Sequence, residues 1–161
     1  MSTRPYGTWP TPVTSELVVR AARAIGALAP DGDDVWWSEG RPEEGGRIAV
    51  LRRRADGSVA EVLGTPWSAR TAVHEYGGGA WWARDGVLWF ADWPSQRLHR
   101  LGPDDGEPVP LTPEPAVPRG LRYADGSVSP DGSAILCVRE DHTGDERARR
   151  AGGAGDRCAG P

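Results

Sequence analysis

Short apolar segments of similar composition recur three times along this chain. The first group opens with Asp34-Val35-Trp36-Trp37, the second with Gly86-Val87-Leu88-Trp89-Phe90, and the third with Ala134-Ile135-Leu136-Cys137-Val138. Val87 follows Val35 by 52 residues, and Ala134 follows Val87 by 47. A four-stranded unit that recurs about every 40–50 residues is typical of the blades of a β-propeller. The repeat therefore predicts an all-β fold built from successive blades.

Asp-Gly pairs punctuate these segments, and such pairs favour tight turns between strands. They occur at residues 31–32, 56–57, 85–86, 105–106, 125–126 and 131–132. The strands predicted around them are residues 34–39, 47–54, 58–63, 79–84, 87–92, 97–101, 108–112, 121–128 and 134–140. A sandwich of similar strands whose spacing is accidental is the alternative fold.

The N-terminal part has a different pattern. Residues 1–13 are rich in proline and have no apolar period, which indicates an extended arm. From Thr14 to about Leu28, apolar residues recur at a spacing of three to four, which predicts one helix. The sequence thus predicts an arm and helix at residues 1–30, a partial propeller of about two and a half blades at residues 31–142, and a tail at residues 143–161.

The tail from residue 143 onwards contains no leucine, isoleucine, valine or aromatic residue. A segment with so few apolar side chains cannot bury enough surface to offset its loss of conformational entropy. We expect residues 143–161 to be disordered and not homologous to any other protein. A genuine polar C-terminal tail is the alternative.

Composition excludes several classes of function. The net charge of −4 leaves no basic footprint, so we expect no nucleic-acid partner. No run of 18 apolar residues exists, so we expect no membrane partner and a cytoplasmic location. The two cysteines form neither a disulfide framework nor a metal site. We expect no cofactor and no metal.

Five segments together carry a resemblance to a known family. They are Pro5-Tyr6-Gly7-Thr8-Trp9-Pro10, Trp36-Trp37-Ser38-Glu39-Gly40-Arg41-Pro42, the segment from Arg70 to Gly79, the turn Ser129-Pro130-Asp131-Gly132 with its following strand, and Val138-Arg139-Glu140-Asp141-His142. These resemble the N-terminal region of bacterial serine peptidases of the prolyl oligopeptidase family, in the dipeptidyl or acylaminoacyl peptidase branch. The resemblance covers residues 5 to about 142.

In that family a propeller of seven or eight blades caps a C-terminal α/β-hydrolase domain that carries a Ser-Asp-His triad. The resemblance implies that the matching region gates and orients peptide substrates. The present sequence has no Gly-x-Ser-x-Gly nucleophile motif. We therefore assign no catalytic residue. We expect the chain to stop before the hydrolase domain, which would be its missing partner, and to be catalytically silent alone. A stand-alone propeller that binds peptides or proteins is the alternative function, and an unstable product without function is a third.

The stretch Val73-His74-Glu75-Tyr76-Gly77-Gly78-Gly79 is the most distinctive local feature. The glycines match no phosphate-binding loop, since the chain has no lysine, and His74-Glu75 lacks the second histidine of a zinc-peptidase helix. One interpretation is a crossover turn that leads into the first strand of the second blade. The other, implied by the resemblance, places His74, Glu75 and Tyr76 beside the substrate, with Glu75 pairing with a free amino group.

Overall fold

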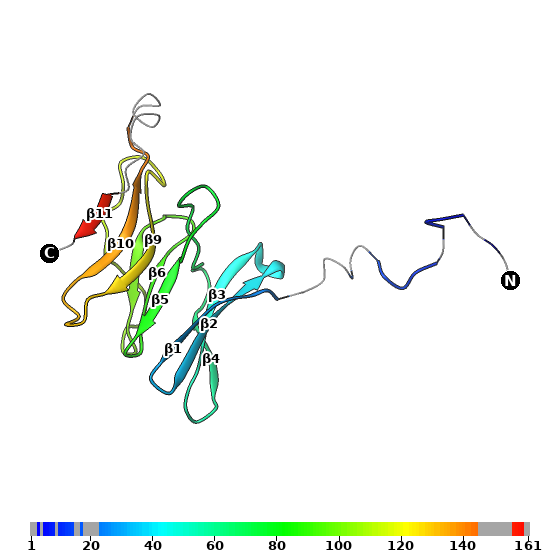
Figure 1. The fold of residues 1–161 in the computed structure, drawn as a ribbon, viewed down its shortest axis with the longest axis horizontal. Coiled ribbons are helices and arrows are strands. Elements are labelled where there is room, and N and C mark those ends of the chain that lie inside the picture. Colours follow the sequence, from blue (N-terminus) through cyan, green and yellow to red (C-terminus); the bar gives the residue numbers. More distant parts are fainter. Residues whose placement is uncertain are drawn as a thin grey trace.

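The computed structural model describes residues 3, 5–8, 10–14, 17, 23–144 and 156–159. These residues form three antiparallel sheets that lie side by side in chain order (Figure 1). The first sheet contains β1 (Ile25–Asp31), β2 (Asp34–Arg41), β3 (Arg47–Arg53) and β4 (Val59–Leu63). The second contains β5 (Trp81–Arg84), β6 (Val87–Ala91), β7 (Leu98–Leu101) and β8 (Val109–Pro110). The third contains β9 (Leu121–Val128), β10 (Ile135–Asp141) and β11 (Asp156–Ala159).

Each sheet is a meander in which consecutive strands pair with one another. The first strand of the second sheet, β5, contacts the first strands of both neighbouring sheets, β1 and β9. This is the arrangement of propeller blades, whose first strands lie next to one another around a common axis. The fold is therefore all-β and corresponds to part of a β-propeller, as predicted. A single 3₁₀ turn, Pro42–Glu44, connects β2 to β3.

All nine predicted strands are present, and their ends differ from the prediction by no more than two residues. The predicted turns at Asp-Gly pairs are also present, with one exception. Asp125-Gly126 lies inside β9, where two residues face the single Cys137 of β10 and form a bulge.

The predicted helix is wrong over residues 25–28, because these residues lie in β1 and pair with β2. Backbone pairing along β2, together with packing of Ala29 against the apolar core, outweighs the helical spacing of the apolar residues. The first sheet thus begins at Ile25, inside the segment assigned to the arm and helix. Residues 15, 16 and 18–22 of the predicted helix lie outside the described residues.

The predicted disorder of residues 143–161 is wrong for Asp156–Ala159, which form β11 against β10. The edge of β10 carries unpaired backbone donors and acceptors, and these groups bind an added strand whatever its side chains are. Residues 145–155, 160 and 161 lie outside the described residues.

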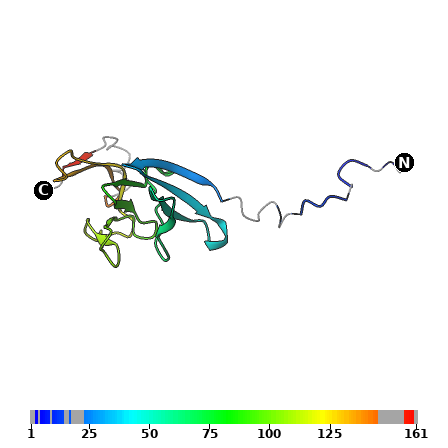
Figure 2. The ribbon, with the colours of Figure 1, turned by 90° about the horizontal axis from the view of Figure 1, so that it is seen from below.

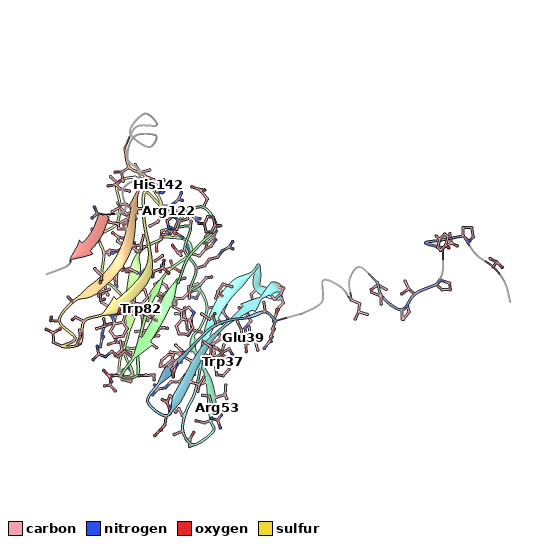
Figure 3. All side chains as sticks on the ribbon, in the orientation of Figure 1. Trp37, Glu39, Arg53, Trp82, Arg122 and His142 are labelled. Atoms are coloured by element: carbon pink, nitrogen blue, oxygen red, sulfur yellow. The ribbon has the colours of Figure 1, made fainter. Side chains whose placement is uncertain are left out.

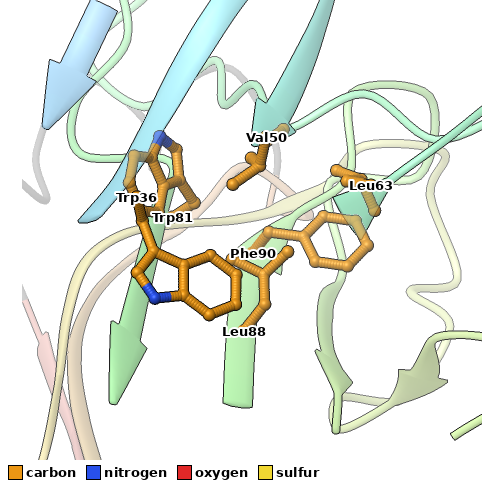
Figure 4. Packing of buried hydrophobic residues seen from close by; sticks show 7 residues of the cluster. Trp36, Val50, Leu63, Trp81, Leu88 and Phe90 are labelled. Carbon is orange, nitrogen blue, oxygen red and sulfur yellow. The ribbon is translucent and has the colours of Figure 1, made fainter. Parts of the chain in front are cut away.

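Two apolar clusters join the sheets to one another. The cluster between the first and second sheets contains Trp36, Val50, Leu63, Ala69, Trp81, Leu88 and Phe90 (Figure 4). The cluster between the second and third sheets contains Ala91, Leu98, Tyr123 and Cys137, with Trp82 packed against it. Stability in such an array comes from stacking between neighbouring units.

The described residues of the N-terminal arm lie away from the sheets (Figure 2). The side chains of Tyr6, Val13 and Leu17 are all more than half exposed. None of these described arm residues contributes to the two apolar clusters. No helix among the described residues is long and apolar enough to cross a membrane, and a cytoplasmic location stays a prediction.

Candidate functional site

The stretch that the sequence singled out is the connection from β4 to β5, as the crossover interpretation predicted. Its backbone turns sharply, with the N–H of Glu75 donating to the carbonyl of Ala72 at 3.1 Å and the N–H of Gly77 donating to the carbonyl of Val73 at 2.8 Å. His74 and Glu75 have positive φ angles of 57° and 66°. Two consecutive non-glycine residues in this region are uncommon, and strain of this kind is typical of functional sites.

The three glycines serve different purposes. Gly77 has a φ of 98°, which a residue with a side chain rarely adopts. A Cβ on Gly79 would lie 2.7 Å from Oδ1 of Asp125, and a Cβ on Gly78 would lie 3.0 Å from the Cβ of Ala124. Gly78 and Gly79 therefore allow the chain to pass close against β9.

Although the loop connects the first and second sheets, side chains of the third sheet hold it. Arg122 donates through Nη1 to the carbonyl of Ala72 at 2.8 Å and forms an ion pair with Glu75 at 2.9 Å. Asp125 accepts the N–H of Gly79 at 2.7 Å, and its own N–H donates to the Gly79 carbonyl at 2.8 Å. Arg122 and His142 lie at the same end of the third sheet (Figure 3).

Glu140 forms the centre of a second set of contacts. Its Oε1 accepts the backbone N–H of His74 at 2.8 Å and lies 3.1 Å from Nδ1 of the same residue. Its Oε2 lies 3.0 Å from Nε2 of His142. Burial raises the pKa of Glu140, but the hydrogen bonds from His142 and from the His74 backbone outweigh burial and hold the pKa below its usual range. The carboxylate is thus kept ionised between two imidazoles.

The three candidate residues are brought together, and they point to solvent to different extents. The side chain of Glu75 is 81% exposed and that of His74 is 51% exposed. Tyr76 is 89% exposed, and its ring stacks on the imidazole of His74 at 5.8 Å between centroids. An exposed carboxylate, a histidine and a phenol therefore form one surface patch, in which Arg122 already neutralises Glu75.

The sequence did not single out Arg122 or Asp125, and Glu140 and His142 were named only as part of the segment Val138–His142 that carries the family resemblance. Arg122, Asp125 and Glu140 are each 46 or more residues from the loop atoms that they contact, and His142 is linked to the loop through Glu140. No local pattern signals such a contact, because it depends on how one blade packs on the next. The repeat predicted the strands but not this register between blades.

The patch does not line the groove between the first and second sheets. That groove has a volume of about 740 Å³, and Trp36, Glu61, Trp67 and Leu101 form part of its wall. Within the described residues, no group of three His, Cys, Asp or Glu side chains is arranged to hold a metal ion. The patch can thus form ion pairs and hydrogen bonds with a ligand at an open surface.

Comparison with known proteins identifies structural neighbours. No protein-family model and no curated protein sequence matches the chain. A Mycobacterium tuberculosis puromycin-hydrolyzing peptidase matches with a TM-score of 0.77 and 49% identity over 87% of this chain. A puromycin hydrolase S511A mutant complexed with PGG matches with a TM-score of 0.77 and 39% identity over 89% of the chain. Puromycin hydrolase itself matches with a TM-score of 0.76 and 40% identity over 89% of this chain.

The match covers only a small part of each neighbour. The chain spans 22% of the M. tuberculosis peptidase and 23% of the two puromycin hydrolase chains. Identities of 39–49% with such TM-scores show that the chain has the fold of that segment. The chain therefore resembles a short part of peptidases whose described activity is the hydrolysis of puromycin.

Proposed function

We propose that this chain is the N-terminal propeller segment of a serine peptidase of the prolyl oligopeptidase family, in its dipeptidyl or acylaminoacyl branch. Its role is to admit and orient substrates, and the attack on the scissile bond belongs to a hydrolase domain. The observation that carries the proposal is the 49% identity with a peptidase segment of the same fold over 87% of the chain. The absence of a Gly-x-Ser-x-Gly motif from the 161 residues accords with a role outside the chemical step.

The patch of His74, Glu75 and Tyr76 is the proposed substrate-facing surface. Its strained backbone, held by Glu140 at His74 and by Asp125 at Gly79, presents an exposed carboxylate. A carboxylate at a fixed position attracts a protonated amino group, which a free peptide N-terminus or an aminoacyl amide supplies. Release of Glu75 from Arg122 would leave this carboxylate free to accept the ligand.

A chimeric enzyme tests this role of Glu75. In the chimera, residues 5–142 replace the matching segment of the M. tuberculosis peptidase, and the substrates are puromycin and N-acetylpuromycin, which lacks the cationic amine. We expect Glu75→Gln to raise KM for puromycin about tenfold, equivalent to about 1.4 kcal/mol of binding. The KM for N-acetylpuromycin should not change.

Two further variants separate an anchoring role from a structural one. Glu107→Gln alters an exposed carboxylate that is outside the patch and should leave both KM values unchanged. Arg122→Gln removes the cation that competes for Glu75, so the KM for puromycin should stay the same or fall. An increase in KM with Arg122→Gln equal to that with Glu75→Gln would show that the ion pair only holds the loop.

A further inference from the structure

The groove between the first and second sheets is bounded on one side by β4 and the segment that follows it. Its lining includes every residue from Ala60 to Trp67. Consecutive residues of a strand point to opposite faces of the sheet, so the side chains of one face alone cannot line a groove without a break. The groove therefore runs along the edge of β4.

The outer edge of β4 carries backbone groups that β3 does not pair. β4 is the outermost strand of the first sheet, and β3 is its only partner (Figure 1). The N–H of Arg54 donates to the carbonyl of Ser58 at 2.9 Å, and such hydrogen-bonded pairs alternate with non-hydrogen-bonded pairs along an antiparallel ladder. The register thus places Val59 and Glu61 at non-hydrogen-bonded positions, where their N–H and C=O groups point away from β3.

These outward groups have no partner strand. Within the part of the chain that the structure describes, no hydrogen bond joins the backbone of Val59 or Glu61 to a segment beyond β3. The side chain of Val59 is 55% exposed. Both sheets beside the groove already have four strands, the number in a propeller blade, so neither sheet is an incomplete blade at this edge. An unpaired edge of this kind is a template for an added strand.

The lining of the groove contains apolar side chains from both sheets. Trp36 and Leu63 are buried there, and Trp67 and Leu101 are half-buried. The volume of about 740 Å³ lies within the range of about 300–1,000 Å³ that is usual for ligand-binding clefts. A segment that enters the groove can therefore bury apolar side chains as well as pair its backbone.

The charges along the groove balance one another. Three of the charged lining side chains have an ion-pair partner within the chain, namely Arg52, Glu61 and Asp105. The other two, Arg54 and Glu107, are exposed and opposite in sign. A charged ligand would thus find no excess of the opposite charge, whereas an uncharged segment can enter without burying an unpaired charge.

We propose that this groove binds an uncharged peptide segment in an extended conformation, which adds to the edge of β4 as a fifth strand of the first sheet. Its N–H and C=O groups pair with those of Val59 and Glu61, and every second side chain lies against the apolar lining. The partner is therefore a segment with apolar side chains at alternate positions. The groove is separate from the patch of His74, Glu75 and Tyr76, and the inference does not depend on the proposed peptidase role.

The test uses the 161-residue chain and the end-capped peptide acetyl-Thr-Val-Thr-Val-Thr-amide. The control peptide has the same side chains and carries N-methyl groups on its three central residues, which remove N–H donors from both of its edges. The readouts are the backbone amide signals of Val59 and Glu61 in a ¹H–¹⁵N NMR titration and the hydrogen exchange of these two amides. We expect saturable shifts and slower exchange with the first peptide and neither with the control.

A pair of variants at one position tests the role of the strand edge. Val59→Pro removes an outward N–H and no hydrogen bond to β3, which an edge strand tolerates. It should weaken peptide binding at least about tenfold, because one backbone hydrogen bond is lost and the ring obstructs the edge. Val59→Thr keeps the N–H and the branched shape and should bind as the unmodified chain does. Urea unfolding of both variants shows whether they keep the fold.

Three results would overturn the proposal. The first is equal binding of the N-methylated peptide, which needs no variant and so does not depend on how well Val59→Pro folds. The second is unchanged affinity in a folded Val59→Pro chain. The third is a dimer of the peptide-free chain in sedimentation that Val59→Pro abolishes, since the strand that pairs with β4 would then belong to a second copy.

Discussion

His99 is a histidine whose surroundings disfavour its charged form. The residue is 4% exposed, and its ring lies between Trp67 at 4.9 Å and Phe90 at 5.4 Å. Burial lowers the pKa of His99 below 6.5, although its contact with the carbonyl of Arg97 acts in the opposite direction. An unfolded histidine takes up a proton near pH 6.5, whereas the folded one does so only at lower pH. The neutral ring therefore stabilises the fold above pH 6.5, and this contribution is lost as the pH falls towards the folded pKa.

The prediction is that His99→Phe makes the free energy of unfolding less dependent on pH between 8 and 5. Phenylalanine keeps the aromatic packing and cannot take up a proton. The measurement is urea unfolding of both proteins across this range, with the His99 ring titrated by NMR. A midpoint for His99 at or above pH 6.5, or parallel pH curves for the two proteins, would contradict the account.

Hydrogen bonds from side chains to the backbone join the hairpin turns of neighbouring sheets. Asp31, in the turn that ends β1, accepts the N–H of Asp85 at 2.7 Å and the N–H of Gly86 at 2.8 Å. Arg84 donates in turn to the carbonyls of Ser129 at 2.7 Å and Pro130 at 2.9 Å. Each hairpin turn is therefore tied to the turn of the next sheet.

We predict that Asp31→Ala lowers the free energy of unfolding by about 1–2 kcal/mol, because it removes two hydrogen bonds to an ionised acceptor. The control is Asp33→Ala, which alters an exposed neighbour that accepts no hydrogen bond within the described structure and should change stability little. Both values come from urea denaturation monitored by circular dichroism. Equal effects of the two substitutions would show that the contact between turns contributes nothing.

Sequence patterns predict the strands of this fold well and their exceptions poorly. Alternating apolar residues and Asp-Gly turns are local signals, and they located nine strands. Asp125-Gly126 has the sequence of a tight turn but lies inside β9. Asp125 is needed there to accept the N–H of Gly79, and glycine is needed at position 126 because a Cβ would lie 2.0 Å from the ring of Trp82. β1 was missed because the spacing of its apolar residues is helical, and only its pairing with β2 makes it a strand.

The candidate site shows the same limit. The three consecutive glycines in the sequence were enough to predict that the site lies in the turn before β5. Its supporting residues, such as Arg122 and Glu140, come from the third sheet and become neighbours only when blades stack.

Across the whole molecule, the first and third of the three neighbouring sheets expose large apolar side chains. On the first sheet, Ile25 is 70% exposed, Leu28 is 67% exposed and Val59 is 55% exposed. On the third sheet, Leu136 is 54% exposed. In a propeller such side chains pack against further blades, and the solved neighbours have chains of which this one spans less than a quarter.

The central claim is that this chain works as a propeller segment of a peptidase. The most direct measurement is puromycin hydrolysis by the chimera in which residues 5–142 replace the matching segment of the M. tuberculosis peptidase. The account predicts a soluble enzyme whose kcat/KM lies within about tenfold of the parent, a difference of about 1.4 kcal/mol in transition-state stabilisation. A chimera that unfolds cooperatively like the parent but does not hydrolyse puromycin would contradict it.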